Sequence, residues 1–242
     1  MYAIKGSSSD SLAQRYKQLQ AEIGAASEAA GRSEGAVHLL AVSKTQPASA
    51  IADVAALGQR DFGENYLQEA LEKIHALREL SLTWHFIGPI QSNKTRDIAE
   101  HFDWVHSVDR EKIAQRLSEQ RPAHLPPLNI CIQVNIDDED SKSGVAIADV
   151  PALATIVHAL PGLTFRGLMA IPRADSADHN AAAFRTLAMT LSSLRNTISD
   201  LKTQHTSQLD TLSMGMSDDF KVAIAEGATF VRLGTALFGP RN

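Results

Sequence analysis

The sequence predicts an α/β fold, a single (β/α)8 barrel of the TIM type with one extra helix before the first strand. Segments with strand character and segments with helix character alternate along the whole chain, mostly with short connections. About eight strands can be counted, which is the number that closes such a barrel. The length of 242 residues is typical of α/β barrels that form one domain. We therefore expect residues 1–242 to build one domain around one core.

The first half of the chain predicts the extra helix and four strand–helix units. Residues 10–31 carry apolar side chains at helical spacing, with Ser8 to Asp10 as N-cap candidates and Gly31 as the terminator. Strands are expected at short apolar runs, residues 39–42, 61–65, 83–88 and 104–108. Helices are expected to follow them, over residues 47–57, 67–77, 94–102 and 109–120.

The second half continues the alternation after a loop that contains Pro122, Pro126 and Pro127. Further strands are expected at residues 128–136, 163–171, 212–216 and 230–238, the last a strand, or a strand and loop, with Gly234 in its middle. A polar loop is expected over residues 137–144, and helices over about 150–160, 180–201 and 218–226. An open doubly wound sheet is the alternative fold. Against it, no G-x-G-x-x-G motif follows the first strand and the sequence contains no P-loop motif.

Composition and charge exclude several classes of function. The formal net charge is −5 and no basic block occurs, so we expect no nucleic-acid partner. No stretch has membrane-spanning length, and the N-terminus lacks the apolar core of a signal peptide. We therefore expect a cytoplasmic protein without membrane association. The single cysteine, Cys131, lies in an apolar strand, which excludes a disulfide framework and indicates a packing role.

Lys44 stands at the end of the first predicted strand, in the stretch LLAVSKT of residues 39–45. Four apolar residues indicate a strand buried on both faces, and Pro47 then opens an alanine-rich helix. In parallel α/β folds, ligands bind at the carboxyl ends of the strands. A lysine amine that is partly desolvated there is able to attack a carbonyl carbon. The alternative is a lysine that extends from the strand end into solvent.

The loops after the seventh and eighth strands have the composition of a phosphate site. In barrels these two loops often bind phosphate through backbone N–H groups. Here they contain hydroxyl and glycine residues, namely Ser213, Ser217, Gly234 and Thr235. Asp218 and Asp219, expected in the first turn of the next helix, would repel a phosphate, so we place it nearer Ser213, Gly234 and Thr235. The alternative is that Ser217 is a helix N-cap and the glycines are turn residues.

Arg232, at the end of the last strand, completes a set of groups that suits one cofactor. Pyridoxal phosphate (PLP) has an aldehyde for Lys44, a phosphate for the two loops and a pyridine nitrogen for Arg232. Because arginine stays protonated, it donates a hydrogen bond to that nitrogen and keeps it unprotonated. The ring is then a weaker electron sink, which disfavours transamination. The alternative for Arg232 is a salt bridge at the barrel rim.

Seven segments of the sequence resemble the pyridoxal phosphate homeostasis proteins, the YggS/PROSC family. The resemblance runs in order from about residue 10 to the end, and its segments are LLAVSKT (39–45), FGENY (62–66), WHFIGPIQSNK (84–94), SKSG (141–144), GLMAIP (167–172), LSMGMSD (212–218) and VRLGTALFG (231–239). As a set these segments are highly specific. The resemblance implies a barrel like the N-terminal domain of alanine racemase, with PLP in Schiff-base linkage to Lys44.

The function that this resemblance implies is to hold PLP and to maintain its intracellular supply, with little or no catalytic turnover. The expected cofactor contacts are Lys44, Asn65, Ser213, Ser217, Arg232, Gly234 and Thr235. No catalytic residue is expected. PLP-dependent apo-enzymes are the expected protein partners, and we expect the chain to be a monomer.

Two enzymatic alternatives remain open. An amino-acid racemase needs a second acid/base group, which in racemases is a tyrosine from an additional β-domain of a partner subunit. This chain ends at Asn242 and offers only Tyr2, Tyr16 and Tyr66, so we do not expect a correctly placed second base. A Schiff-base aldolase usually needs carboxylates and a second lysine near the imine, and Glu64 is the one carboxylate expected there. A yellow purified protein would exclude the aldolase, and loss of optical rotation in alanine would identify a racemase.

Other polar residues are expected to have structural roles. His85, His101 and His106 lack metal-ligand spacing with acidic or thiol partners, so no metal is predicted. His85 lies between Trp84 and Phe86 and is expected to be a hydrogen-bonded core histidine. Lys142 is the rival lysine, but its polar loop makes it a poorer imine former than Lys44, suited at most to transient binding at the rim.

Overall fold

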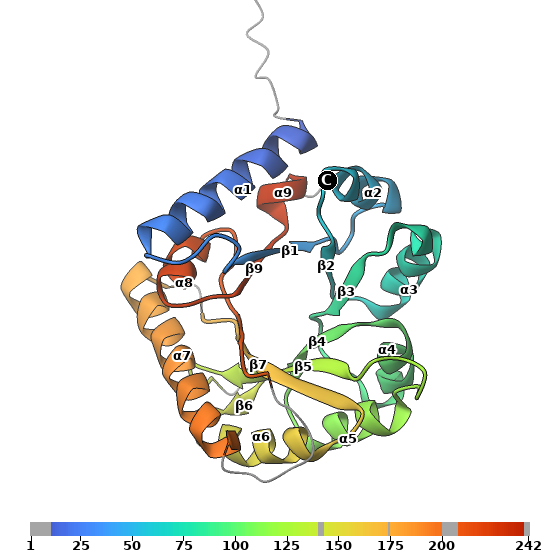
Figure 1. Ribbon diagram of the computed structural model, residues 1–242, viewed down its shortest axis with the longest axis vertical. Coiled ribbons are helices and arrows are strands. Elements are labelled where there is room, and N and C mark those ends of the chain that lie inside the picture. Colours follow the sequence, from blue (N-terminus) through green and yellow to red (C-terminus); the bar gives the residue numbers. More distant parts are fainter. Residues whose placement is uncertain (1–10, 140–142, 174, 200–207, 240–242) are drawn as a thin grey trace, which may run out of the picture.

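The computed structural model of the chain describes residues 11–139, 143–173, 175–199 and 208–239. Eight parallel strands close into a barrel, and helices lie outside it between successive strands (Figure 1). The predicted (β/α)8 barrel with its extra N-terminal helix is therefore confirmed. The prediction that residues 1–242 form a single domain stays a prediction.

The strands follow one another around the ring in chain order. They are β1 (His38–Val42), β2 (Asp61–Glu64), β3 (Thr83–Phe86), β4 (Trp104–Val108), β5 (Leu128–Asn135), β7 (Leu163–Ala170), β8 (Thr211–Ser213) and β9 (Phe230–Leu233). Pairing of β9 with β1 and of β4 with β5 closes the ring. A short strand that the sequence did not predict, β6 (Val145–Ala146), pairs with the end of β5 outside the ring.

The helices lie close to their predicted positions. They are α1 (Leu12–Ala29), α2 (Ala48–Ala56), α3 (Leu67–Ala76), α4 (Thr95–His101), α5 (Glu111–Gln120), α6 (Val150–Ala159), α7 (Ala177–Ser199), α8 (Phe220–Ala225) and α9 (Thr235–Phe238). Short 3-10 segments also occur, namely η1 (Arg78–Leu80), η2 (Ser92–Lys94) and η3 (Ile147–Asp149). Ser11 caps α1 in a capping box with Gln14. The predicted N-cap candidates Ser8 to Asp10 lie outside the described residues.

Two predicted boundaries near the carboxyl end are wrong. The last strand ends at Leu233, and residues 235–238 form the helix α9 instead of continuing the strand. The apolar residues after Gly234 suit either a strand or a helix. Gly234 stands at the junction, between the end of the strand and the start of the helix. The helix after β8 begins at Phe220, so Asp218 and Asp219 precede this helix and do not occupy its first turn.

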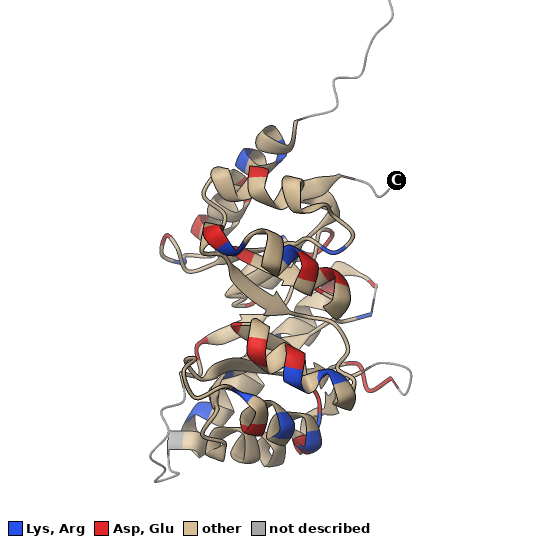
Figure 2. Cartoon of the chain, turned by 90° about the vertical axis from the view of Figure 1, so that its right-hand side faces the viewer, with Lys and Arg blue, Asp and Glu red and all other residues tan. Residues whose placement is uncertain are grey.

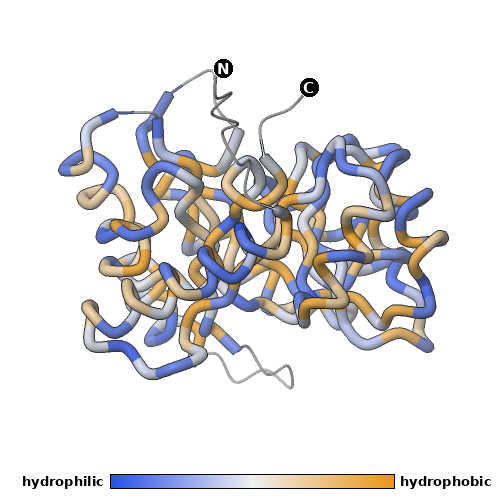
Figure 3. The backbone as a smooth tube through the Cα atoms, turned by 90° about the horizontal axis from the view of Figure 1, so that it is seen from above, coloured by the Kyte–Doolittle hydropathy of each residue, from blue (hydrophilic) through white to orange (hydrophobic). Residues whose placement is uncertain are grey.

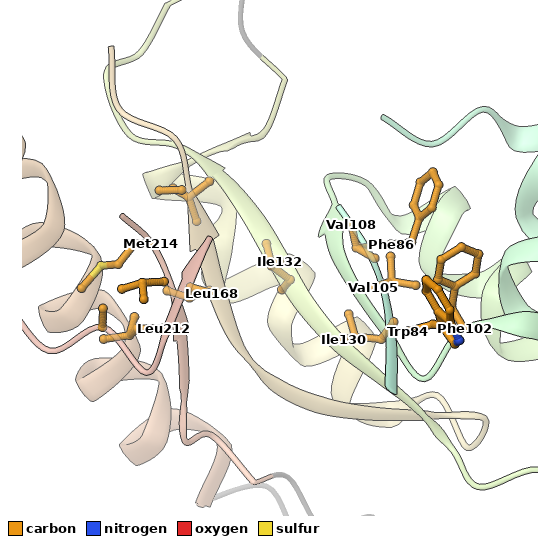
Figure 4. Packing of buried hydrophobic residues seen from close by; sticks show 14 of the residues in the cluster. Trp84, Phe86, Phe102, Val105, Val108, Ile130, Ile132, Leu168, Leu212 and Met214 are labelled. Carbon is orange, nitrogen blue, oxygen red and sulfur yellow. The ribbon is translucent and has the colours of Figure 1, made fainter. Parts of the chain in front are cut away.

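The strands are buried on both faces, because one set of side chains meets the helices and the other fills the lumen. On β1, Leu39 and Ala41 belong to the outer core, whereas Leu40 belongs to a cluster inside the ring. Figure 4 shows part of the outer core, in which the rings of Phe86 and Phe102 lie 5.3 Å apart. The inner cluster consists of Leu40, Trp104, Cys131, Met169 and Phe230.

Charged and apolar residues are separated accordingly. Figure 2 shows Lys, Arg, Asp and Glu concentrated on the helices and loops around the barrel. Figure 3 shows hydrophilic and hydrophobic positions alternating along the outer helices, as expected for helices with one face against a sheet. Among the residues that the structure describes, no helix has the length and hydropathy needed to cross a membrane. Cys131 is fully buried, and burial raises the pKa of its thiol, which fits the predicted packing role.

The extra helix α1 packs against α8 and α9, at the point where the chain closes the barrel (Figure 1). Its buried face carries Tyr16, Leu19 and Ile23. Arg15 donates from Nε to the carbonyl of Leu237 at 2.7 Å and from Nη2 to the carbonyl of Phe238 at 3.2 Å. The amino-terminal helix therefore holds the last helix of the barrel in place.

Candidate functional site

The carboxyl ends of the barrel strands enclose a cavity of about 170 Å³, here called the mouth cavity. Its lining comes from the ends of the strands and from the segments that follow them, and consists of Val42, Lys44, Asn65, Ile87, Ile171, Met216, Ser217, Arg232, Gly234 and Thr235. Six predicted site residues are thus brought together, namely Lys44, Asn65, Ser217, Arg232, Gly234 and Thr235. The seventh, Ser213, lies outside the lining. A polar set of this kind in a small apolar-walled cavity is typical of a ligand site.

Lys44 follows the end of β1 by two residues, and its side chain is half-buried. The next residue, Thr45, has a φ of +65°, a left-handed conformation that β-branched residues rarely adopt. The Thr45 N–H donates to Glu69 Oε1 at 2.6 Å, which holds this turn. Strained backbone of this kind concentrates at functional sites. The strained turn therefore points to Lys44 as a candidate functional residue of the mouth cavity.

A buried ionic cluster lies behind the Lys44 turn. Lys73, on α3, is 5% exposed and donates from Nζ to the Ser43 carbonyl and to Glu64 Oε1, both at 2.8 Å. It also contacts Glu69 Oε1. Ser43 Oγ donates to the same Glu64 oxygen at 2.6 Å. These bonds fix the backbone at Ser43, and through it the point from which the Lys44 side chain extends.

The pKa of the Glu64 carboxyl, at the centre of this cluster, is subject to opposing effects. Glu64 is fully buried, and burial raises the pKa of its carboxyl, while the hydrogen bonds from Lys73 and Ser43 work against that rise. Glu64 does not line the mouth cavity, so its partner in the structure is the ammonium of Lys73. The sequence pointed to Glu64 but not to Lys73, whose one local signal is its position four residues after Glu69 on a helix.

Arg232 forms the floor of the mouth cavity and is 5% exposed. Its Nη1 donates to Ser213 Oγ at 3.0 Å, and its Nη2 donates to the Ala170 carbonyl at 3.0 Å. Burial lowers the pKa of the guanidinium to about 10, so the group is still protonated at neutral pH. Among the described residues, no carboxylate forms an ion pair with Arg232, so the alternative of a rim salt bridge is not supported.

The two glycine-containing loops meet at one side of the mouth cavity, where Ser217, Gly234 and Thr235 line it. Gly215 has a φ of +90°, and a Cβ there would stand 2.6 Å from the Cβ of Ala223, so only glycine fits this loop. The Arg232 N–H donates to the Gly215 carbonyl at 2.9 Å, which ties the loops together. The first N–H groups of a helix such as α9 have no partner within the helix, and they suit an anion.

Asp218 and Asp219 face away from this arrangement. Both line a neighbouring cavity together with Asn180, and neither lines the mouth cavity. Asp219 accepts from the Met216 N–H at 2.6 Å and from Asn180 Nδ2 at 3.0 Å, and burial raises the pKa of its carboxyl. The phosphate position expected from the sequence therefore lies on the side of the loops without carboxylates.

Ser213 lies beneath Arg232 and is fully buried. Its Oγ is 2.7 Å from His106 Nδ1, His106 Nε2 is 2.9 Å from His85 Nδ1, and His85 Nε2 is 3.0 Å from Asp61 Oδ1. Burial, with smaller contributions from His85 and Arg232, holds the pKa of His106 well below its usual value. His85 is thus a hydrogen-bonded core histidine, as predicted. The continuous series of contacts was not predicted.

Several other candidates do not reach the mouth cavity. Tyr16 is buried in α1, Tyr66 is 55% exposed and outside the lining, and Tyr2 lies outside the described residues. Lys142, the rival lysine, also lies outside the described residues. In the described part of the chain, no group of three or more His, Cys, Asp or Glu side chains is arranged to hold a metal.

Asn65 gives a direct indication that a bound molecule belongs here. Its Oδ1 is buried and has no hydrogen-bond partner among the described residues, although the side chain lines the mouth cavity. Nearly all buried polar atoms in folded proteins have a partner, so this atom calls for one from outside the chain. The lysine amine, the arginine and the hydroxyl groups around it fit a ligand with a carbonyl group and an anionic group, as PLP has.

Comparisons with known proteins place the chain in a class of barrel proteins. Residues 12–242 match the family described as "Alanine racemase, N-terminal domain". Within this class, the chain is 60% identical over 233 residues to the pyridoxal phosphate homeostasis protein of Pseudomonas aeruginosa, with 96% of each chain covered. It is 52% identical over 235 residues to that of Escherichia coli K12, with 96% and 97% covered. The chain belongs to the family of pyridoxal phosphate homeostasis proteins, which confirms the resemblance found in its sequence.

Solved structures show the same architecture. PipY of Synechococcus elongatus PCC7942, with PLP bound, matches with a TM-score of 0.81 at 37% identity, over 95% of this chain and 100% of PipY. The PipY structure without PLP matches with a TM-score of 0.83 at 38% identity, over the same shares of the chains. Alanine racemase from Corynebacterium glutamicum matches with a TM-score of 0.67 at 19% identity, over 95% of this chain and 61% of the racemase. That likeness concerns the fold alone.

Proposed function

We propose that this protein binds pyridoxal 5′-phosphate as a Schiff base on Lys44 and maintains the intracellular supply of the cofactor, with little or no catalytic turnover. One observation carries the proposal: a lysine amine, a buried arginine and two glycine-containing loops line the same small cavity. Membership in the family and the PLP-bound structure of PipY support it.

Each part of the mouth cavity has a role in holding the cofactor. Lys44 provides the amine for the Schiff base, and Val42, Ile87 and Ile171 provide apolar walls. Ser217, Gly234 and Thr235 are placed to hold the phosphate with hydroxyl and N–H donors. Asn65 offers its side-chain amide to a polar group of the ring. Ser213, which does not reach the cavity, contributes through its hydrogen bond with Arg232.

Arg232 is the candidate partner of the pyridine nitrogen. Bound PLP supplies an electron-withdrawing ring, which is strongest when its nitrogen is protonated. A guanidinium that stays protonated at neutral pH donates a hydrogen bond to the nitrogen and leaves it without a proton. The resulting weak electron sink favours storage over turnover. The described tyrosines, Tyr16 and Tyr66, do not line the cavity, which also argues against a racemase.

The proposed function also concerns protein partners, the cellular location and the oligomeric state. A cavity at the open end of the barrel is reachable by other proteins, so we propose that PLP-dependent apo-enzymes receive the cofactor from it. Supply of intracellular PLP implies a cytoplasmic location. We propose that the chain acts as a monomer.

Borohydride reduction followed by mass spectrometry tests the proposed function. The purified protein, loaded with PLP, should be yellow and after reduction should carry one added pyridoxyl phosphate group, on the peptide that contains Lys44. An alanine solution incubated with the loaded protein should keep its optical rotation. A label on a different lysine would contradict the site, and rapid loss of optical rotation would contradict the storage role.

Replacing Arg232 by glutamate should shift the absorption spectrum of bound PLP, because a carboxylate favours a protonated ring nitrogen. The comparison is Arg173→Glu, which makes the same charge change at an exposed arginine of the neighbouring cavity and should leave the spectrum unchanged. Arg232→Gln is a milder second variant in case the glutamate prevents folding. A spectrum unchanged in Arg232→Glu with PLP bound would mean that Arg232 is not at the nitrogen.

A further inference from the structure

We propose that Asp61, His85, His106 and Ser213 form a hydrogen-bonded relay of fixed direction through the barrel lumen, which orients the Arg232 guanidinium toward the cofactor ring. The relay is a property of the protein chain alone. Its meaning for the cofactor rests on the proposed PLP site. The four residues are positioning residues, because they act on the ring only through Arg232.

The relay crosses the barrel from one end to the other. The relay and Arg232 together come from five strands: Asp61 begins β2, His85 and His106 lie on β3 and β4, Ser213 ends β8 and Arg232 lies on β9. Taken in that order, the four contacts measure 3.0, 2.9, 2.7 and 3.0 Å. Asp61 also lines a second cavity, of about 450 Å³, together with other residues at the amino-terminal ends of the strands. Arg232 lines the mouth cavity at the opposite end.

The two ends of the relay determine its direction. A guanidinium only donates, so Ser213 Oγ accepts from Arg232 Nη1. A carboxylate only accepts, so Asp61 Oδ1 receives the N–H of His85 Nε2. A neutral imidazole has one N–H and one acceptor nitrogen. His85 Nδ1 therefore accepts from His106 Nε2–H, and His106 Nδ1 accepts the hydroxyl proton of Ser213.

The opposite direction leaves bonds unmade. With a proton on His106 Nδ1, Ser213 Oγ would accept twice, and its own hydroxyl proton would have no acceptor in the described part of the chain. His85 would then have to donate from both nitrogens, which places a positive charge among Trp104 and Phe230. The lowered pKa of His106 agrees with a neutral His106 ring in this lumen.

Aromatic packing holds the two histidine rings in place. His85 stacks on Trp104 with centroids 5.4 Å apart and planes 12° from parallel. His106 meets Phe230 edge-on at 5.9 Å. Because the rings are fully buried and confined, Ser213 has a fixed acceptor for its proton and presents a fixed lone pair to Arg232. The Ala170 carbonyl holds the second nitrogen of the guanidinium.

The consequence is a guanidinium that is oriented before the cofactor arrives. Two of its nitrogens are held by Ser213 and Ala170, and the side chain lines the mouth cavity with its remaining N–H groups available. A preorganised donor loses little side-chain freedom on binding, which strengthens binding and keeps the hydrogen bond to the ring nitrogen well aligned.

Nitrogen-15 NMR of the histidine rings in the PLP-free protein tests the relay without the cofactor. Resonances are assigned with single His→Gln variants. His85 and His106 should both be neutral, with the proton on Nε2. A proton on Nδ1 of His106, or a doubly protonated His85 at neutral pH, would overturn the proposal.

Ser213→Ala breaks the relay next to Arg232. We expect the Nδ1 resonance of His106 to shift, because this nitrogen loses the hydroxyl that donates to it. We also expect a shift in the absorption spectrum of bound PLP and a dissociation constant for PLP raised by about tenfold. Ser107→Ala is the matched control, because Ser107 is also buried but donates to the Gly88 carbonyl, at 2.6 Å, outside the relay. It should leave all three measurements unchanged.

Asp61→Ala tests the far end at a side chain that is 28% exposed, where folding is least at risk. The N–H of His85 Nε2 should lose its acceptor, so the resonance of this nitrogen should shift, with a smaller shift in the PLP spectrum. Asp210→Ala removes the same charge from the same amino-terminal cavity without touching His85, and should change neither. An unchanged Nε2 resonance of His85 in Asp61→Ala would overturn the relay.

The two readouts separate this inference from the proposed function. If the histidine nitrogen resonances respond as expected but the PLP spectrum does not change in Ser213→Ala, the relay does not act on the cofactor and the proposal is wrong. If the unmodified protein binds no PLP, the proposed function fails together with the cofactor part of this inference, whereas the histidine tautomers still decide whether the relay exists.

Discussion

Lys44→Ala is expected to abolish the PLP that borohydride can trap. Among the described residues, Lys44 is the one lysine in the lining of the mouth cavity, so no other described amine there can form the covalent link. The phosphate loops and Arg232 would remain, and the variant should bind PLP weakly and release it on dialysis. The measurement is the mass increase per chain after reduction, which should fall from one pyridoxyl phosphate group to none.

Two other lysine variants complete this experiment. Lys17→Ala removes an exposed lysine of α1 and should keep full labelling. Lys142→Ala tests the rival lysine; it should also keep full labelling, while slower transfer of PLP to an acceptor enzyme would indicate transient binding at the rim. Full stoichiometric label in Lys44→Ala would move the site to another residue.

Lys73→Ala is expected to lower the free energy of unfolding by about 3–5 kcal/mol, because it leaves the carboxylate of Glu64 buried without an opposite charge. A typical domain has only about 5–15 kcal/mol of stability in total, so this loss is large. Urea unfolding followed by circular dichroism measures it. The variant should also label less completely at Lys44, because Ser43 loses the ammonium that holds its carbonyl.

A surface pair of the same chemistry provides the comparison. Lys221 Nζ lies 2.8 Å from Glu22 Oε2 with its side chain 60% exposed, so Lys221→Ala should cost less than about 1 kcal/mol. The double variant Lys73→Met with Glu64→Gln should be more stable than Lys73→Met alone, since it removes the stranded charge. Equal losses for the buried and the surface lysine would show that the cluster does not stabilise the fold.

The barrel and most of the site could be predicted because they depend on local patterns. Apolar runs such as residues 39–42 mark buried strands, and the residue after such a run comes to the mouth in any closed parallel barrel. This rule alone brought Lys44, Asn65 and Arg232 together from distant parts of the chain. The same rule explains why the loops after β8 and β9 met at one side of the cavity.

The remaining features depend on which way a side chain points once the ring has closed. Ser213 is the last residue of β8, and its inward direction buries it under Arg232. Lys73 has a helical position that would suit a surface ion pair with Glu69, and only the approach of α3 to β2 and to Ser43 buries it. The His85–His106 contact joins two strands through the lumen, and nothing in either strand alone predicts it.

Arg15 donates hydrogen bonds to the carbonyls of Leu237 and Phe238, and these bonds connect the docking of α1 with the position of α9. If α9 holds the phosphate of PLP at its first turn, then loading the cofactor and docking α1 are thermodynamically coupled, and each strengthens the other to the same degree. Loss of the Arg15 contacts would therefore weaken the binding of PLP as well as the docking of α1.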